Sequence, residues 1–395
     1  MKILYISSLS IGDNNGGGIE AKKIHLSLKN IKNNFQDFDY RVIALNDNID
    51  FKLDVELSKN RYKDLLARFF LHSNYLYLEW WFKIKKKVYK FDPDVIILGS
   101  SRLGFIAKDI KENNNSCYII GHFHNIELDY LETYSQMYRG LLPKTFKFIE
   151  KTAVKRDEKM MLENMDLGLF LTNRDVKRAQ KIYNLKFNYK VLPICVQEFN
   201  KLLKAENNYD INLVFIGSLW YGSNIEAIKW FLKNVWKKLL DKKYNINLII
   251  GGSNPSNDFL SFLYTFNGIS LYPDFENIED IIPQNSILIS PVQTGAGMKV
   301  KVAEALSLGL PIIGSPETLI GYEEAINDKD NYRIINKAVK PQDYINHIIK
   351  LIISQNDNKI KNKAKSLYDK YYSLKRSIRT FKYIFDKRDK TTRGE

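Results

Sequence analysis

Short runs of β-branched and aliphatic residues alternate along this chain with longer amphipathic stretches. This alternation is typical of βαβ units, in which parallel strands are joined by helices that cover the sheet. In the first half, the expected strands are Lys2–Ser7, Tyr40–Leu45, Asp94–Leu98, Cys117–Gly121, Leu167–Thr172 and Lys190–Pro193. In the second half, they are Ile211–Gly217, Asn247–Gly252, Ile287–Ser290, Pro311–Gly314 and Tyr332–Ile335. The pattern therefore predicts an α/β fold with parallel sheets.

The polar stretch Val196–Asp210 contains no expected strand and separates the two series. We therefore predict a doubly wound domain over residues 1–195, a linker over 196–210 and a second domain over 211–358. The helical, aromatic-rich stretch over residues 359–395 follows the last strand, and we interpret it as a helix that crosses back to the first domain and ends in a tail. Ligands of open α/β sheets bind outside the carboxyl ends of the strands, so the loops at those ends are the candidate sites.

The chain of 395 residues carries 60 Lys and Arg against 45 Asp and Glu, a formal charge of +15. Such an excess favours an anionic partner, whether nucleic acid, an acidic membrane surface or a phosphorylated substrate. A biased genome is the alternative source of the charge, because Lys, Asn and Ile are all abundant. The two cysteines, Cys117 and Cys195, exclude a disulfide framework. Without an apolar run of about 18 residues or a secretory signal, we expect a soluble, cytoplasmic protein.

A glycine-containing loop follows the expected strand Ile287–Ser290 and opens a helix near Met298. The amino terminus of a helix exposes unpaired N–H groups at the positive end of its dipole, where an anion binds. Lys299 and Lys301, in the first turn, add positive charge, so a diphosphate is the natural occupant. Glu304 shares a helix face with Lys301 and can accept hydrogen bonds from ribose hydroxyls. The alternative is that the glycines only make a tight turn and that Glu304 is solvated. A Walker loop is excluded because the chain has no GK[ST] here.

The run Gly295–Ala305 (GAGMKVKVAEA), followed by Gly309–Ile313 (GLPII), resembles the donor-binding motif of GT-B glycosyltransferases, above all the retaining family four, or group 1. The likeness continues upstream at Phe215–Asn224. It is specific over Asn212–Gly321 and looser over the first domain. The resemblance implies two facing Rossmann-like domains, the GT-B architecture, with a C-terminal helix that crosses back to the first domain.

In that family, the second glutamate of an E-x-seven-E motif binds the ribose, and Glu304 is the matching residue. The first glutamate falls at Ala296, so a methyl group replaces the usual partner of the donor-sugar hydroxyls. The Arg and Lys that the family commonly has after the first strand of this domain are missing here. Their places are taken by Trp220, Tyr221 and Asn224. We hypothesise that Lys299 and Lys301 supply the displaced charge, and Lys299 is therefore a predicted catalytic residue. The predicted donor-binding residues are Gly217, Ser218, Gly295, Ala296, Gly297, Met298, Lys299, Lys301 and Glu304.

A glycine triplet, Gly16, Gly17 and Gly18, follows the first expected strand and precedes a helix that begins at about Ile19. The same preference for an anion applies there, although the triplet lacks the GxGxxG spacing and a flexible loop is the alternative. The resemblance implies that this loop reaches toward the donor phosphates or the acceptor. We therefore assign the triplet to a predicted acceptor or phosphate loop.

A polar stretch from His122 to Glu127 follows the expected strand Cys117–Gly121. An H-x-H pair can bind zinc when further ligands converge, but with five histidines in the chain and no paired cysteine spacing we predict no metal. An imidazole here suits a hydrogen bond to a sugar hydroxyl or a proton transfer near neutral pH, and a histidine satisfied within the loop is the alternative. The stretch is similar to the family's His-Asn-x-Glu, which makes His124 the predicted catalytic histidine. His122 and Glu127 join the predicted acceptor loop.

Asp92-Pro93-Asp94 matches the DxD that holds a metal in the other glycosyltransferase fold, but it precedes a buried strand, and we interpret it as a turn. Two basic, aromatic-rich regions, Arg61–Phe91 and Tyr138–Lys159, are open to three interpretations. They suit an anionic membrane, single-stranded nucleic acid, or a core face opposite a solvated lysine face. The resemblance favours membrane contact, because many family members modify lipid-linked acceptors at the cytoplasmic leaflet.

Together these features predict a retaining glycosyltransferase that moves a sugar from a UDP or GDP donor to a saccharide or lipid-linked saccharide. The predicted setting is bacterial surface polysaccharide biosynthesis (capsule, O-antigen or similar). Catalysis would rest on stabilising the departing diphosphate. We expect no cofactor, metal or nucleic acid. The expected location is the cytoplasm, with a peripheral position at the inner face of the cytoplasmic membrane as the alternative. The alternatives are a nucleotide-sugar epimerase of similar fold and a non-catalytic basic binding protein.

Overall fold

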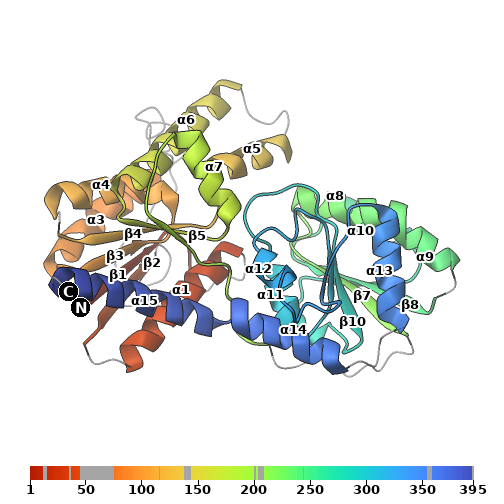
Figure 1. Cartoon of the computed structure of the whole chain (residues 1–395). Coiled ribbons are helices and arrows are strands. Elements are labelled where there is room, and N and C mark those ends of the chain that lie inside the picture. The colour runs from red at the N-terminus through yellow and green to blue at the C-terminus, as the bar shows by residue number, and fades with distance from the viewer. Residues whose placement is uncertain are drawn as a thin grey trace. The chain divides into compact units, whose positions relative to one another are not determined.

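The computed structural model describes residues 1–11, 16–34, 37–44, 75–114, 116–137, 144–199, 202, 209–242, 244–353 and 358–393. The chain divides into two compact units, one formed by Met1–Ile194 with Leu374–Glu395 and the other by Cys195–Ser373. Each unit contains a six-stranded parallel sheet surrounded by helices (Figure 1). The prediction of an α/β chain with two Rossmann-like domains is therefore confirmed. None of the described helices is both long and apolar enough to cross a membrane.

The sheet of the first unit has the strand order β2-β1-β3-β4-β5-β6, and all of its pairs are parallel. Its strands are β1 (Lys2–Ser7), β2 (Asp39–Ala44), β3 (Val95–Leu98), β4 (Tyr118–Phe123), β5 (Leu167–Phe170) and β6 (Tyr189–Val191). All four side chains of β3 are buried, as is usual where helices cover both faces of a parallel sheet. Because β1, β3 and β4 are parallel neighbours, their carboxyl ends meet at one edge, where polar side chains gather.

The helices of the first unit cover this sheet and supply its core. They are α1 (Gly16–Asn34), α3 (Tyr75–Phe91), η1 (Ser101–Leu103), α4 (Gly104–Asn113), α5 (Glu127–Met137), α6 (Lys144–Asn164) and α7 (Asn173–Tyr183). Trp80 and Trp81 of α3 belong to the same buried cluster as Phe123 of β4. The ring of Phe123 stacks on that of Phe170 in β5, with centroids 4.3 Å apart.

The motif Asp92-Pro93-Asp94 lies in the connection from α3 to β3, before the strand begins. Asp92 has a left-handed backbone with a φ of 50°, and its N–H donates to the carbonyl of Val88 at the end of α3. Asp94 accepts a 2.7 Å hydrogen bond from the backbone N–H of Lys2. These residues therefore form a turn, as predicted, at the opposite end of the strand from the candidate sites.

The C-terminal helix α15 (Leu374–Arg393) returns to the first unit and packs against α1 (Figure 1). The hydroxyl groups of Ser27 and Ser377 form a buried 2.8 Å hydrogen bond across this contact. The preceding helix α14 (Asn358–Tyr371) packs instead on α11 (Val300–Ser307) in the second unit. The return therefore begins at Leu374 rather than at residue 359, because α14 and α15 are both amphipathic and periodicity alone does not separate them.

The sheet of the second unit has the order β12-β11-β10-β7-β8-β9 and is also parallel throughout. Its strands are β7 (Ile211–Ile216), β8 (Ile246–Gly252), β9 (Ile269–Pro273), β10 (Ser286–Ser290), β11 (Ile312–Gly314) and β12 (Ile335–Lys337). Strand β9 was not predicted, because it is an edge strand whose side chains are half-buried or exposed and it lacks a buried apolar run. Strand β12 begins where the predicted strand Tyr332–Ile335 ends, and that prediction was displaced by three residues.

The helices of the second unit pack on both sides of its sheet. They are α8 (Gly222–Phe231), a π-helical turn η2 (Leu232–Trp236), α9 (Lys237–Asp241), α10 (Asn257–Leu263), η3 (Ile278–Asp280), α11, α12 (Glu323–Ile326), α13 (Pro341–Ile353) and α14. The buried ring of Tyr344 in α13 meets the rings of Trp230 and Phe231 edge-on, with centroids 5.5 and 6.1 Å away. These contacts hold α13 against α8.

The chain leaves the first unit after Ile194 and returns to it at Leu374. Residues next to these two points are hydrogen-bonded to each other within the second unit. The backbone N–H of Val196 donates to the carbonyl of Tyr372 at 2.9 Å. The hydroxyl of Tyr368 donates to the carbonyl of Val196, also at 2.9 Å. Of the predicted linker 196–210, residues 200, 201 and 203–208 lie outside the described residues.

Candidate functional site

The glycine loop of the second unit connects β10 to α11 at the carboxyl edge of the sheet. Helix α11 begins at Val300, so the prediction that it begins near Met298 placed its start two residues too early. Lys299 occupies the N-cap position with an extended backbone, and Lys301 lies in the first turn. The hydroxyl of Tyr322 donates to the carbonyl of Lys299 at 2.7 Å and accepts from the N–H of Ala303 at 3.1 Å, so it fixes both sides of this turn.

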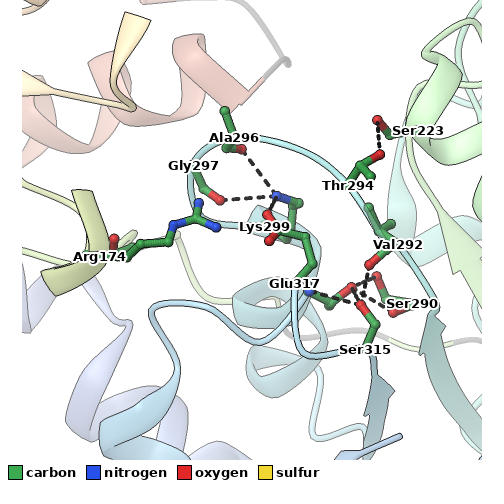
Figure 2. Close-up of polar contacts among 12 residues, drawn as sticks. Arg174, Ser223, Ser290, Val292, Thr294, Ala296, Gly297, Lys299, Ser315 and Glu317 are labelled. Atoms are coloured by element: carbon green, nitrogen blue, oxygen red, sulfur yellow. Dashed lines mark hydrogen bonds and ion pairs between the residues drawn. The ribbon is translucent and has the colours of Figure 1, made fainter. Parts of the chain in front are cut away.

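The ammonium group of Lys299 holds the glycine loop closed. Its Nζ donates to the carbonyls of Ala296 and Gly297 at 3.2 and 3.1 Å, as Figure 2 shows. It also lies 3.4 Å from the Oε1 of Glu317, with both side chains largely buried. The structure thus places this predicted catalytic lysine beneath the loop, where it organises the backbone.

Buried hydroxyl groups anchor this loop to the neighbouring strand. Thr318 donates through its Oγ1 to the carbonyl of Ser290 at 2.7 Å, and its N–H donates to the Oγ of Ser315 at 3.1 Å. The Oγ of Ser315 donates in turn to the carbonyl of Val292 at the start of the loop (Figure 2). Because these side chains are buried and paired, the loop has a rigid support at the carboxyl ends of β10 and β11.

Lys301 is half-buried at the start of α11. Its Nζ is 3.3 Å from the Oδ1 of Asn224 and 4.3 Å from the centroid of the Phe215 ring. Burial, with a further contribution from Lys299, lowers the pKa of Lys301 to about 7. One turn further along the helix, burial raises the pKa of Glu304 to about 7, and Lys301 opposes this rise. The pKa values of both side chains therefore lie near 7. Lys301 is the predicted contact of a diphosphate, and Glu304 is the predicted contact of a ribose.

The loop after β7 completes this cluster. A Cβ on Gly217 would lie 2.9 Å from both the Nζ of Lys301 and the Nδ2 of Asn224, so only glycine leaves these two side chains where they are. The Nδ2 of Asn224 donates to the carbonyl of Ser218 at 3.0 Å. The structure therefore brings together the predicted residues Gly217, Ser218 and Lys301. It adds Asn224, which sequence reasoning noted only as a departure from the family pattern.

In the first unit, the predicted glycine loop is largely helical. Helix α1 begins at Gly16, so Gly16, Gly17 and Gly18 form its first turn, and the prediction that they precede a helix beginning at about Ile19 was wrong. We expected a loop because glycine disfavours helix interiors, but the penalty is smaller where the turn is terminal. Residues 12–15, between β1 and this turn, lie outside the described residues.

His122 and His124 lie together at the end of β4, beneath α1. Their rings meet edge-on with centroids 4.5 Å apart. The Nε2 of His124 donates to the carbonyl of Gly99 at 2.6 Å, so one nitrogen is satisfied within the fold. Burial, with a contribution from His122, lowers the pKa of His124 to about 4, and burial and Lys23 hold the pKa of His122 well below its usual range. Both rings are therefore neutral at pH 7, and proton transfer near neutrality does not suit them. The catalytic role of His124 stays a prediction.

Glu127 begins α5 and is held by two partners that sequence reasoning missed. Its Oε2 accepts from the Nε of Arg102 at 2.7 Å, and its backbone N–H donates to the Oε1 of Glu158 at 3.0 Å. Glu158 is fully buried and also accepts from the hydroxyls of Ser101 and Tyr183, at 2.9 and 2.6 Å. Burial raises the pKa of Glu158 to about 7. Its position on the buried side of an amphipathic helix was the available signal.

The basic regions are described only from residue 75 and from residue 144 onward, and the remainder, 61–74 and 138–143, lies outside the described residues. In α3, Trp80 and Trp81 are buried while Phe82 and several lysines are exposed. In α6, Ala153 and Val154 are buried. The described parts therefore fit the interpretation of a core face opposite a lysine face.

Comparisons with known proteins agree with this architecture. Residues 210–354 match the family Glycosyl transferases group 1. An uncharacterized 44.6 kDa protein in the cps region of Klebsiella pneumoniae is 26% identical over 192 residues, which are 46% of this chain and 47% of that protein. The chain thus matches about half the length of this curated relative.

Three solved structures share the fold of the whole chain. A glycosyltransferase from Rickettsia africae is 14% identical with a TM-score of 0.64, over 98% of each chain. The lipopolysaccharide outer core galactosyltransferase WaaB is 14% identical with a TM-score of 0.60, over 98% of this chain and 100% of its own. Anabaena HepE in complex with UDP-glucose is 11% identical with a TM-score of 0.59, also over 98% and 100%. These likenesses establish the GT-B fold.

Proposed function

We propose that the protein transfers a sugar from a nucleotide diphosphate to a saccharide or lipid-linked saccharide, because residues 210–354 match the family Glycosyl transferases group 1 and the chain has the GT-B fold. The proposed setting is bacterial surface polysaccharide assembly, because the curated relative is encoded in a cps region. A UDP sugar is the first donor to test, since HepE binds UDP-glucose in the same fold. A GDP sugar is the second.

The observation that carries the proposal is the ammonium of Lys301 at the start of α11. It lies half-buried against Asn224 and the Phe215 ring, and its pKa is lowered to about 7. A diphosphate placed at this helix terminus would supply the negative charge that the position lacks. The lysine would then be fully protonated, and the dipole of α11 would act in the same direction.

These residues suit the step in which charge develops on the leaving group. The bond from the anomeric carbon to the diphosphate oxygen breaks, and a bond from that carbon to the acceptor oxygen forms. Negative charge develops on the departing diphosphate as the first bond breaks, and the acceptor hydroxyl gives its proton to an oxygen of that diphosphate. The N–H groups at the start of α11 and the ammonium of Lys301 would stabilise that charge. Glu304 would accept hydrogen bonds from the ribose hydroxyls and fix the position of the nucleotide.

The resemblance to the retaining family supports retention of configuration at the anomeric carbon. The sugar would then keep its original anomeric configuration in the product, which nuclear magnetic resonance of the isolated product would reveal directly. Inversion would contradict this part of the proposal and leave the transferase activity intact.

We further propose that the protein is cytoplasmic and makes peripheral contact with an anionic membrane. It is supported by the charge of +15 and by the exposed side of α3, where lysines flank the exposed ring of Phe82. Sedimentation with vesicles of anionic and of neutral lipid tests it. Equal sedimentation with both would contradict a role for the charge.

Thermal unfolding of the full chain in the presence of UDP, GDP, ADP and their sugars is the primary test. A ligand that binds the native state at 100 times its Kd stabilises it by about 2.7 kcal/mol, which raises the unfolding midpoint. We expect one nucleotide class to raise the midpoint and its sugar to be consumed when an acceptor is added. The absence of a shift with every nucleotide would contradict the proposal, and an epimerised sugar without acceptor would favour an epimerase.

A further inference from the structure

Three potential metal ligands converge within the first unit, beneath the first turns of α1. Glu20 comes from α1, His122 from β4 and His124 from the loop that follows it. The ligand atoms that the three side chains offer all lie within 4.8 Å of one another. Glu20 and His122 are 1% and 0% exposed and His124 is half-buried, so the cluster lies at the boundary of the interior.

The cluster contains buried polar atoms that the fold leaves unsatisfied. Within the described part of the chain, the Oε1 of Glu20, both ring nitrogens of His122 and the Nδ1 of His124 have no hydrogen-bond partner, and the Nε2 of His122 lies 3.4 Å from the Oε2 of Glu20. Because the Nε2 of His124 donates to Gly99, its Nδ1 carries a lone pair and not a proton. A carboxylate oxygen and an imidazole lone pair are both acceptors, and burying them together is unfavourable unless a cation or a donor lies among them.

The groups around the cluster are those that orient metal ligands in proteins. A metal-binding histidine usually donates its other N–H to a backbone carbonyl, as His124 does to Gly99. A metal-binding carboxylate usually accepts a hydrogen bond on its second oxygen, and the Oε2 of Glu20 is paired with the buried ammonium of Lys23. The remaining oxygen of Glu20 is the one without a partner.

We propose that Glu20, His122 and His124 bind a divalent first-row metal ion, with Zn²⁺ as the first candidate. Two imidazoles and one carboxylate form a donor set that zinc accepts, with the fourth position open to water or an anion. Tetrahedral ligands about 2.1 Å from zinc stand about 3.4 Å apart, so the side chains must close by about 1 Å. The positive charge of Lys23 opposes the ion, so we expect weaker binding than at a structural zinc site.

From the sequence we predicted no metal at this H-x-H pair, because the chain has five histidines and no paired cysteine spacing. The third ligand is on α1, which the parallel sheet places above the end of β4. The site also offers an alternative to the predicted catalytic role of His124. If its Nδ1 binds the ion, the same lone pair does not accept a hydrogen bond from a sugar hydroxyl.

Metal binding is tested on the full chain after removal of metals with a chelator. We expect isothermal titration with ZnCl₂ to give one ion per chain, and thermal unfolding to show a higher midpoint with zinc. X-ray absorption of the zinc complex should show two imidazole ligands. If the wild-type chain does not bind one zinc ion, or binds zinc without imidazole ligands, the proposal is overturned, and no variant is needed for this conclusion.

Variants then assign the ligands. Glu20→Gln and His122→Gln should each weaken zinc binding by about tenfold or more. His347→Gln is the matched control, because His347 is a half-buried histidine on α13 in the second unit, and the zinc binding of this variant should equal that of the wild type. Unchanged affinity in folded Glu20→Gln and His122→Gln would contradict the assignment.

Discussion

Lys301 and Glu304 lie one turn apart on the same face of α11, and burial moves the pKa of both side chains to about 7. The shifts are opposite in direction, because burial disfavours the charged form of each group. Near neutral pH, each group is therefore partly charged, and a fall in pH protonates both. Such a pair responds strongly to a ligand that brings charge, which is the property that the proposed donor site needs.

Replacing Lys301 by Met should weaken binding of the nucleotide sugar. The change removes the ammonium but keeps a side chain of similar length over the Phe215 ring, so the fold should be preserved. Loss of a charged hydrogen bond of about 1.5–3 kcal/mol corresponds to roughly 10- to 100-fold in Kd, measurable by isothermal titration with a UDP or GDP sugar. Lys238→Met on α9 is the control, since Lys238 is exposed. Equal affinity in both variants would exclude Lys301 from the site.

The affinity of the wild-type chain for the nucleotide sugar should rise as the pH falls from about 8 to about 6. Below its pKa of about 7, Lys301 is protonated before the ligand binds, so binding no longer includes the uptake of a proton. The diphosphate of a nucleotide sugar carries no titrating proton in this range, so the slope reports the protein. Glu304, whose pKa is also about 7, contributes to the slope as well, so the slope should change in Lys301→Met by the share due to the lysine. A variant that kept the wild-type slope would assign the proton to another group.

Much of the fold could be predicted from the sequence, because a parallel sheet buries its strands on both faces and leaves a visible run of apolar residues. Strand β9 escaped prediction because it lies at the sheet edge, with Tyr272 exposed. Helix boundaries were less certain. Gly16, Gly17 and Gly18 are helical because the first turn of a helix tolerates residues that its interior does not.

The candidate sites were predictable only where their residues are close in the chain. The Gly295–Glu304 segment could be identified because loop, helix terminus and charges follow one another. Asn224 and Glu20 were missed because each acquires a role through a partner on a distant segment, Lys301 in one case and His122 in the other. Glu158 was missed for the same reason, since it supports Glu127 from the buried side of α6. Such pairs depend on strand order, which local patterns do not encode.

Glu158→Gln should remove part of the pH dependence of stability. The folded-state pKa of Glu158 is about 7, against an ordinary value of 4.5, so its folded form retains a proton that the unfolded form releases. Wild-type stability should therefore decrease as the pH rises from about 4.5 through about 7, by up to about 3 kcal/mol. Urea unfolding across this range should show the decrease in the wild type and a smaller one in the variant. Glu112→Gln, at an exposed position on α4, is the control. Parallel curves for the wild type and Glu158→Gln would show that Glu158 is ionised in the folded state at pH 5.

Gly217→Ala should impair donor binding while leaving the fold largely intact. The added Cβ would lie 2.9 Å from the ends of the Lys301 and Asn224 side chains, which can rotate away and so leave the proposed diphosphate site. We expect a loss of roughly tenfold in affinity for the nucleotide sugar, with a loss of about 1 kcal/mol in unfolding free energy from the strained φ of 159°. Gly252→Ala provides the contrast, because its Cβ would lie 1.7 Å from the backbone oxygen of Gly217, which cannot rotate away. That variant should lose stability by more than about 2 kcal/mol. If Gly217→Ala bound the nucleotide sugar as tightly as the wild type, the position of Lys301 would not matter for binding.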